Sequence, residues 1–134
     1  MKKIILLLTI TIYSCTNNFT EKEVIGTYVP VDYKQTFDTI ILMKNGIYHR
    51  KVYDRNKTLM IDMKSQYKIQ ANGSILFYSY FLNLDRDLVK FPELIKDTLG
   101  GGSFILEKID GKIGFCTGYA SASLPNQNCY HKVD

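Results

Sequence analysis

Residues 36–53 read TFDTIILMKNGIYHRKVY, two runs rich in β-branched and aromatic residues on either side of Asn45-Gly46. Asn-Gly is the strongest short signal for a β-hairpin, because a type I′ turn needs positive φ at both central residues. In the returning run, Tyr48, Arg50 and Val52 share one face, since successive side chains of a strand point to opposite faces. This stretch predicts an antiparallel hairpin.

The same pattern of short apolar runs between turn signals continues along the chain. Asn72-Gly73 and Asp110-Gly111 are two further hairpin signals. Residues 75–82 form the most apolar run of the domain, which predicts a central strand covered on both faces. Eight segments are predicted as strands: 24–31, 36–43, 47–53, 58–70, 74–83, 103–109, 112–119 and 128–133.

The stretch 84–99 breaks this pattern. Leu88, Phe91 and Leu94 recur at helical spacing, and Pro92 limits how regular a helix can be. Three consecutive glycines, 100–102, then end the segment. We therefore expect a short helical segment in a long loop between two strands.

The fold class that follows is all-β. Strands joined by successive hairpins form an antiparallel meander, and a sheet of about eight strands must close or fold on itself to protect its edges. The expected architecture is an eight-stranded up-and-down barrel. A half-open curled sheet, with 84–99 as a lid or plug, is the alternative.

The N-terminus has the features of a secretory signal. Lys2 and Lys3 precede an apolar run of about ten residues, which is too short to cross a membrane as a helix. The following Ile12-Tyr13-Ser14-Cys15 resembles the lipobox of bacterial lipoproteins, although Ile12 and Tyr13 depart from its commonest residues. The resemblance implies a signal over 1–14, lipidation of Cys15, a tether over 15–22 and a single domain over 23–134.

Lipidation implies a membrane partner through the N-terminal anchor, and several acyl chains make such anchoring stable. The residue after Cys15 is Thr16 rather than Asp, and no acidic run follows directly. By analogy with lipoprotein sorting, this favours the outer membrane and its periplasmic face. A plain secreted protein, with Cys15 incidental, is the alternative.

The overall composition is that of a globular protein, with 46% hydrophobic and 22% charged residues. The net charge of +4 includes Lys2 and Lys3 of the expected signal. The remaining balance is nearly even, so no nucleic-acid partner is expected.

Two cysteines remain in the expected domain, Cys116 and Cys129, on either side of a predicted turn at 124–127. An oxidising compartment permits a disulfide between them, and two strands of one hairpin bring Cα atoms close enough. Two free thiols are the alternative. Their spacing is not that of a zinc site, and no metal is expected.

Several short motifs together resemble the small lipocalin-like lipoproteins of Bacteroidota. The motifs are an opening Gly-Thr-Tyr, an Asp-Thr-hydrophobic strand leading to Asn-Gly and an aromatic residue, an aromatic-centred strand and a terminal Tyr-x-Lys strand. They stand here at 26–28, 38–48, 66–69 and 130–132. The resemblance implies a barrel and a lipid anchor, and it assigns no functional residue.

No constellation typical of an enzyme stands out, and no catalytic residue or cofactor is expected. His49, next to Arg50-Lys51, and His131, near the C-terminus, are expected to be surface side chains, and the P-loop and G-x-S-x-G patterns are absent. The aromatic residues are the remaining signal, because aromatic walls with a few hydroxyls suit an apolar ligand. A filled aromatic core is the alternative. The candidate ligand-binding residues are Tyr28, Tyr48, Tyr67, Phe77 and Tyr80.

The expected function is that of a non-catalytic binding module of the cell envelope, with a small apolar ligand or an envelope protein as partner. An accessory or structural subunit of an envelope complex is the alternative. A hydrolase acting on cell-envelope substrates is the less favoured third hypothesis.

Overall fold

The computed structural model describes residues 19–32, 37–83, 87–96, 100–118 and 128–134. The expected signal and Cys15 lie outside the described residues. Among the residues described, no helix is long and apolar enough to span a membrane. The strands are β1 (Gly26–Pro30), β2 (Asp38–Met43), β3 (Ile47–Tyr53), β4 (Leu59–Ile69), β5 (Ser74–Tyr78), β6 (Gly101–Ile105), β7 (Glu107–Ile109), β8 (Lys112–Cys116) and β9 (Cys129–Lys132).

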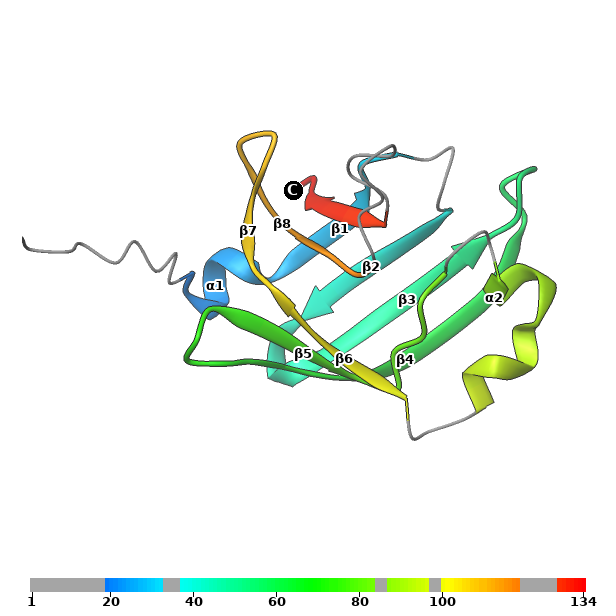
Figure 1. The fold of residues 1–134 in the computed structure, drawn as a ribbon, viewed down its shortest axis with the longest axis horizontal. Coiled ribbons are helices and arrows are strands. Elements are labelled where there is room, and N and C mark those ends of the chain that lie inside the picture. Colours follow the sequence, from blue (N-terminus) through cyan, green and yellow to red (C-terminus); the bar gives the residue numbers. More distant parts are fainter. Residues whose placement is uncertain (1–18, 33–36, 84–86, 97–99, 119–127) are drawn as a thin grey trace, which may run out of the picture.

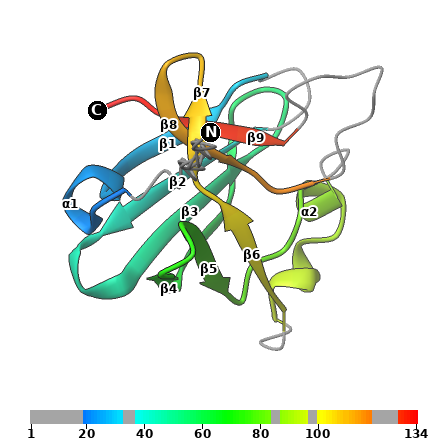
Figure 2. The same cartoon turned by 60° about the vertical axis from the view of Figure 1, so that its left-hand side comes forward.

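The strands form one antiparallel sheet in the order β6-β5-β4-β3-β2-β1-β9-β8-β7. Consecutive strands pair from β1 to β6 and from β7 to β9, whereas β6 and β7 lie at opposite ends of the order; β9 returns to pair with β1. The sheet curls until β6 and β7 cross over the face of β1–β4, as Figures 1 and 2 show. The predicted all-β meander and its near-closure into a barrel are confirmed.

The predicted strand 103–109 is two strands. β6 pairs with β5, β7 pairs with β8, and Leu106 between them donates its backbone N–H to the carbonyl of Gly73 at 2.9 Å. One run of chain thus changes partner in its middle, which gives nine strands instead of eight. Because β6 and β8 are not neighbours in the hydrogen-bonded order, a seam is left between them.

The hairpin between β2 and β3 has the predicted geometry. Asn45 and Gly46 have φ of 71° and 68°, the two positive values that a type I′ turn requires. Asp110 and Gly111, between β7 and β8, repeat this pattern with 51° and 77°.

The prediction of one central strand over 74–83 is wrong in its second half. β5 ends at Tyr78, which is 45% exposed, and Ser79 takes a positive φ of 52°. The chain then turns inward, so that Tyr80 is buried while Leu82 lies partly on the surface. Interior side chains hold this turn: the hydroxyl of Tyr48 donates to the carbonyl of Tyr78 at 2.9 Å.

Short helices cover the two ends of the barrel, which lie far apart in Figures 1 and 2. At one end is α1 (Glu21–Val24), whose Val24 is buried against the main core. At the other end α2 (Asp87–Lys90) and the 3₁₀ helix η3 (Pro92–Lys96) form a cap. The cap confirms the helical segment predicted within 84–99. Its Leu88 packs with Val52 of β3 and Ile61 of β4.

Candidate functional site

The seam between β6 and β8 contains a cavity of about 350 Å³. Sites for small molecules commonly have volumes of about 300–1,000 Å³, so this cavity is large enough for a small ligand. Three glycines are among its lining residues. A Cβ atom on Gly102 would lie only 2.4 Å from the ring of Phe104, so no larger side chain fits at that position without moving the ring. The lining residues are Tyr80, Leu82, Gly101, Gly102, Ser103, Phe104, Cys116, Thr117 and Gly118.

Tyr80 is the lining residue that connects this cavity to the barrel interior. Its ring lies 5.0 Å from the ring of Phe77 and 5.4 Å from that of Phe104, measured between centroids. The guanidinium carbon of Arg50 stands 4.3 Å from its centroid, in a cation–π contact. Packing on several sides fixes the orientation of this ring.

A buried ion pair lies behind Tyr80. Arg50 of β3 and Asp38 of β2 are fully buried, and Nη2 and Nε of Arg50 donate to Oδ2 of Asp38 at 2.6 and 3.2 Å. Nη1 of Arg50 donates to the carbonyl of Phe81, and the Asn83 amide lies 3.5 Å from Asp38 Oδ2. The pair therefore also fixes the segment that leads into the cap.

The phenols beside this pair keep their protons. Burial raises the pKa of Tyr80 and of Tyr130 above the ordinary value; the nearby carboxylate of Asp38 adds to this effect and the guanidinium of Arg50 opposes it. For Arg50, burial acts to lower the pKa, but Asp38 raises it above its usual range. The cluster thus contains a permanent cation, a carboxylate held by it and two neutral hydroxyls.

Three atoms of this cluster lack a hydrogen bond of good geometry. Within the described part of the chain, the hydroxyls of Tyr80 and Tyr130 and Oδ1 of Asp38 are buried without such a partner. Buried polar groups are normally satisfied by protein, water or a ligand. Tyr80 also lines the cavity, together with the hydroxyl-bearing Ser103 and Thr117.

The five predicted ligand-binding residues all lie in one buried aromatic core, with Tyr130, Phe115 and Phe104. Three of the hydroxyls donate to backbone carbonyls: Tyr28 to Val24 at 2.7 Å, Tyr48 to Tyr78 at 2.9 Å, and Tyr67 to Met43 at 2.8 Å. Phe77 packs at the centre of the core, with its ring 5.0 Å from that of Tyr48. Of the five, Tyr80 lines the seam cavity.

Sequence reasoning missed Asp38, Arg50, Leu82, Phe104 and Thr117. A signal for Arg50 was present, because strict alternation places it on the same face as Tyr48 and Val52, both apolar enough for a core. No pattern in the sequence indicates the turn after Tyr78 that places Leu82 at the cavity.

The predicted disulfide is confirmed. Cys116 and Cys129 stand opposite each other in the register of β8 and β9, with Cα atoms 3.9 Å apart and the sulfurs bonded at 1.98 Å. Cys116 also lines the cavity. The bridge therefore fixes one wall of the seam to the strand that closes the barrel.

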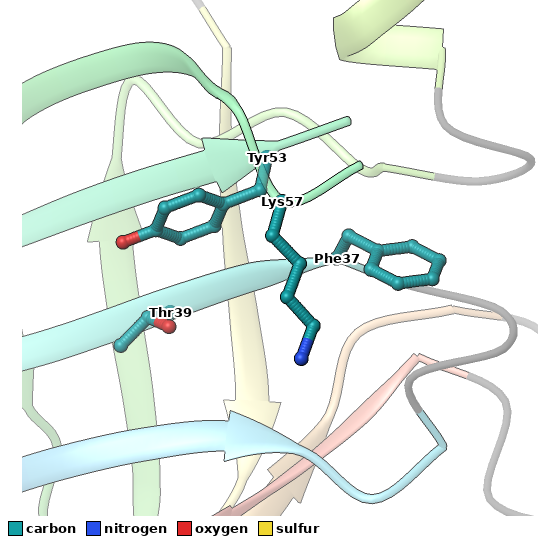
Figure 3. Close-up of a pocket in the computed structure, with 4 residues that line it drawn as sticks. All are labelled: Phe37, Thr39, Tyr53 and Lys57. Atoms are coloured by element: carbon teal, nitrogen blue, oxygen red, sulfur yellow. The ribbon is translucent and has the colours of Figure 1, made fainter. Parts of the chain in front are cut away.

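Further hollows lie away from the seam in the described part of the chain. Phe37, Thr39, Tyr53 and Lys57 line one of about 340 Å³ on β2, β3 and the turn that follows (Figure 3). Another, of about 370 Å³, lies near α1 and includes Tyr67.

Among the residues described, no group of three or more His, Cys, Asp or Glu side chains is placed to hold a metal ion. No protein-family model, curated protein or solved structure matches the chain.

Proposed function

We propose that this protein is a non-catalytic binding module of the cell envelope that holds a small, mostly apolar molecule at the barrel seam. One observation carries the proposal: Tyr80 lines the cavity between β6 and β8, and among the described residues its buried hydroxyl has no hydrogen bond of good geometry. Such a wall suits a ligand with an apolar body and one polar group.

The chemistry of the walls defines this ligand further. Leu82, Phe104 and the disulfide offer apolar surface, while Tyr80 offers a hydroxyl that stays protonated. Thr117 already donates its hydroxyl to the carbonyl of Asn128 at 3.2 Å, so its oxygen serves as an acceptor. A carbonyl or hydroxyl group on the ligand would complete the hydrogen bonds of Tyr80.

The same groups favour binding over catalysis. Asp38 is committed to Arg50, and both phenols hold their protons. A general base must accept a proton near the working pH; the phenols act as hydrogen-bond donors, and the carboxylate of Asp38 already accepts from Arg50. They orient a bound molecule without reacting with it.

Ligand retention tests the proposal. Residues 19–134 are secreted to an oxidising periplasm, exposed to a lipid and metabolite extract of the native cells, and measured by native mass spectrometry. We expect a co-purifying small molecule, lost in Leu82→Trp, which fills the cavity mouth, and weakened in Tyr80→Phe, which removes one hydroxyl.

The matched control is Ile105→Trp on β6, the strand that forms one wall of the cavity, because Ile105 itself is 72% exposed and is not a lining residue. This variant should retain the ligand. A bare wild-type protein after exposure to the extract, or equal retention in all variants, would refute the seam as a ligand site.

The lipid anchor at Cys15 is a separate part of the proposal. It rests on the lipobox-like Ile12–Cys15, and the outer membrane facing the periplasm is the expected location. A disulfide between Cys116 and Cys129 suits an oxidising compartment. Mass spectrometry of the N-terminal peptide should find acyl groups on Cys15, and Cys15→Ala should release the protein from membranes; unchanged partitioning would contradict the anchor.

An accessory subunit of an envelope complex is the second candidate, favoured by the outer side of the cap. Phe91 and Leu94 there are 51% and 42% exposed, and exposed apolar side chains that lie together mark contact surfaces. Cross-linking in cells should then capture one envelope protein with wild type and lose it with Phe91→Ser; retention of the partner would exclude the cap as the contact.

A further inference from the structure

The hollow on the outside of the barrel has a different chemistry from the seam. Thr39 of β2 and Tyr53 of β3 point to the outer face, in the partly exposed positions of their alternating strands. Phe37, just before β2, accepts a backbone hydrogen bond from Tyr53 at 2.7 Å, which keeps the two residues adjacent. Lys57 completes the lining, and Figure 3 shows its side chain extending between Tyr53 and Phe37.

The turn that carries Lys57 is fixed by Asp54. Its Oδ1 accepts the backbone N–H of Asn56 and of Thr58, both at 2.8 Å. The backbone of Asp54 bonds that of Lys57 and Thr58, both at 3.0 Å. This network of local hydrogen bonds closes the turn tightly between β3 and β4.

Within this turn, Lys57 has a φ of 63°. That left-handed conformation suits Gly or Asn and is unfavourable for a lysine. Unfavourable backbone conformations that the surroundings enforce are found disproportionately at functional sites. Here the conformation holds the lysine stem beside the hollow.

The ammonium of Lys57 is available to a ligand. In the part of the chain that the structure describes, no carboxylate lies within salt-bridge distance of it. Thr39 and Tyr53 add hydroxyl groups to the same lining, and Phe37 adds an aromatic surface. A cation with two hydroxyls beside a ring matches a carboxylate joined to an apolar or aromatic body.

We propose that this hollow is a second binding site, independent of the seam, for small organic acids. Lys57 binds the carboxylate, and the body of the acid lies against the aromatic rings of Tyr53 and Phe37, which flank the lysine side chain in Figure 3. The cavity of about 340 Å³ accommodates a molecule the size of a phenyl-substituted short-chain acid.

The test compares two probes of nearly the same shape, one with a charged carboxylate and one with a neutral amide. 3-Phenylpropionate and its neutral amide are titrated into the full-length protein, and amide resonances of Thr39, Tyr53 and Lys57 are followed by NMR. The carboxylate should shift these resonances and the amide should not. Lys57→Gln should weaken binding about tenfold or more, as expected for loss of a charge-assisted hydrogen bond.

Two further variants separate a binding role from a structural one. Lys64→Gln removes a lysine from the outer face of β4, outside the lining of the hollow, and should leave binding unchanged. Lys57→Gly should raise the melting temperature, because glycine suits the positive φ, while abolishing binding. Equal binding of acid and amide, full binding by Lys57→Gln, or no binding up to about 10 mM would overturn the proposal.

Discussion

At the scale of single residues, the buried pair Asp38–Arg50 sets the interior of this barrel apart from a purely apolar one. Taking two charges out of water is costly, and their attraction offsets that cost only when geometry and hydrogen bonding are good. Here two donor atoms of Arg50 reach one carboxylate oxygen, and a third reaches the Phe81 carbonyl. The pair thereby specifies where residues 79–83 lie.

Removal of one partner should therefore be severe. Arg50→Met leaves the carboxylate of Asp38 buried without a cation and frees the Phe81 carbonyl. We expect the free energy of unfolding to fall by about 3–5 kcal/mol, measured by urea denaturation with circular dichroism.

The double variant Asp38→Leu/Arg50→Met is the control for this prediction. It removes both charges, so it should be more stable than Arg50→Met alone. A single variant that unfolds like wild type would show that the pair contributes nothing to folding.

Residue alternation in the sequence predicted much of the interior but not its polar part. Tyr48, Arg50 and Val52 were placed on one face, as the structure has them. Whether an arginine on that face is buried depends on Asp38, twelve residues away on the paired strand. Such a pairing follows from strand register, which a single sequence specifies only through the connecting turn.

At the scale of elements, tertiary contacts override local propensity at the end of β5. Residues 75–82 have the composition of one long strand, yet β5 stops at Tyr78. The hydroxyl of Tyr48 donates a hydrogen bond to the carbonyl of Tyr78, and the guanidinium of Arg50 donates one to the carbonyl of Phe81. Both partners come from β3, about thirty residues earlier, so no local pattern could indicate the break.

The cap shows the reverse case, where helical spacing predicted an element but not its role. Leu88 is fully buried against Val52 and Ile61 and seals one barrel end. Leu88→Ala should cost about 2–5 kcal/mol, the range for a buried leucine, in urea denaturation.

Leu94 is the matched control, because it belongs to the same cap but is 42% exposed. Leu94→Ala should change the stability by about 0.5 kcal/mol or less. If the two variants were equally stable, the cap would not be part of the cooperative core.

The disulfide belongs to the same scale, because it joins neighbouring strands β8 and β9. It closes a loop between positions thirteen apart, for which chain-entropy arguments give about 3 kcal/mol of stabilisation. Dithiothreitol should lower the free energy of unfolding by about that amount. The Cys116→Ser/Cys129→Ser variant should not respond, and a response there would point to a different target of the reductant.

At the scale of the whole molecule, the meander was predictable because turn signals order the strands in sequence. The seam was not. It arises because residues 101–109 divide their pairing between β5 and β8 at Leu106, and the choice of partner depends on the curvature of the complete sheet. No sequence motif indicates the candidate ligand cavity, and of the predicted aromatic residues, which pack in the interior, Tyr80 also lines it.

The density of buried phenols gives the whole barrel a characteristic response to alkaline pH. Burial raises the pKa of Tyr28, Tyr48, Tyr80 and Tyr130 above the ordinary value. The folded chain thus holds these protons more tightly than the unfolded chain, whose phenols ionise at about pH 10. Their contribution to stability is complete below about pH 10 and is lost as the pH rises towards the folded-state values.

We therefore expect two phases when phenolate absorbance is followed with rising pH. Accessible tyrosines should ionise first, while circular dichroism still reports an intact barrel. The buried phenols should ionise only together with loss of the strand signal, because their ionisation requires opening of the core. The urea-unfolded chain should show one phase at about pH 10. A single phase in the folded protein, with the barrel intact, would mean that water reaches the aromatic interior without unfolding.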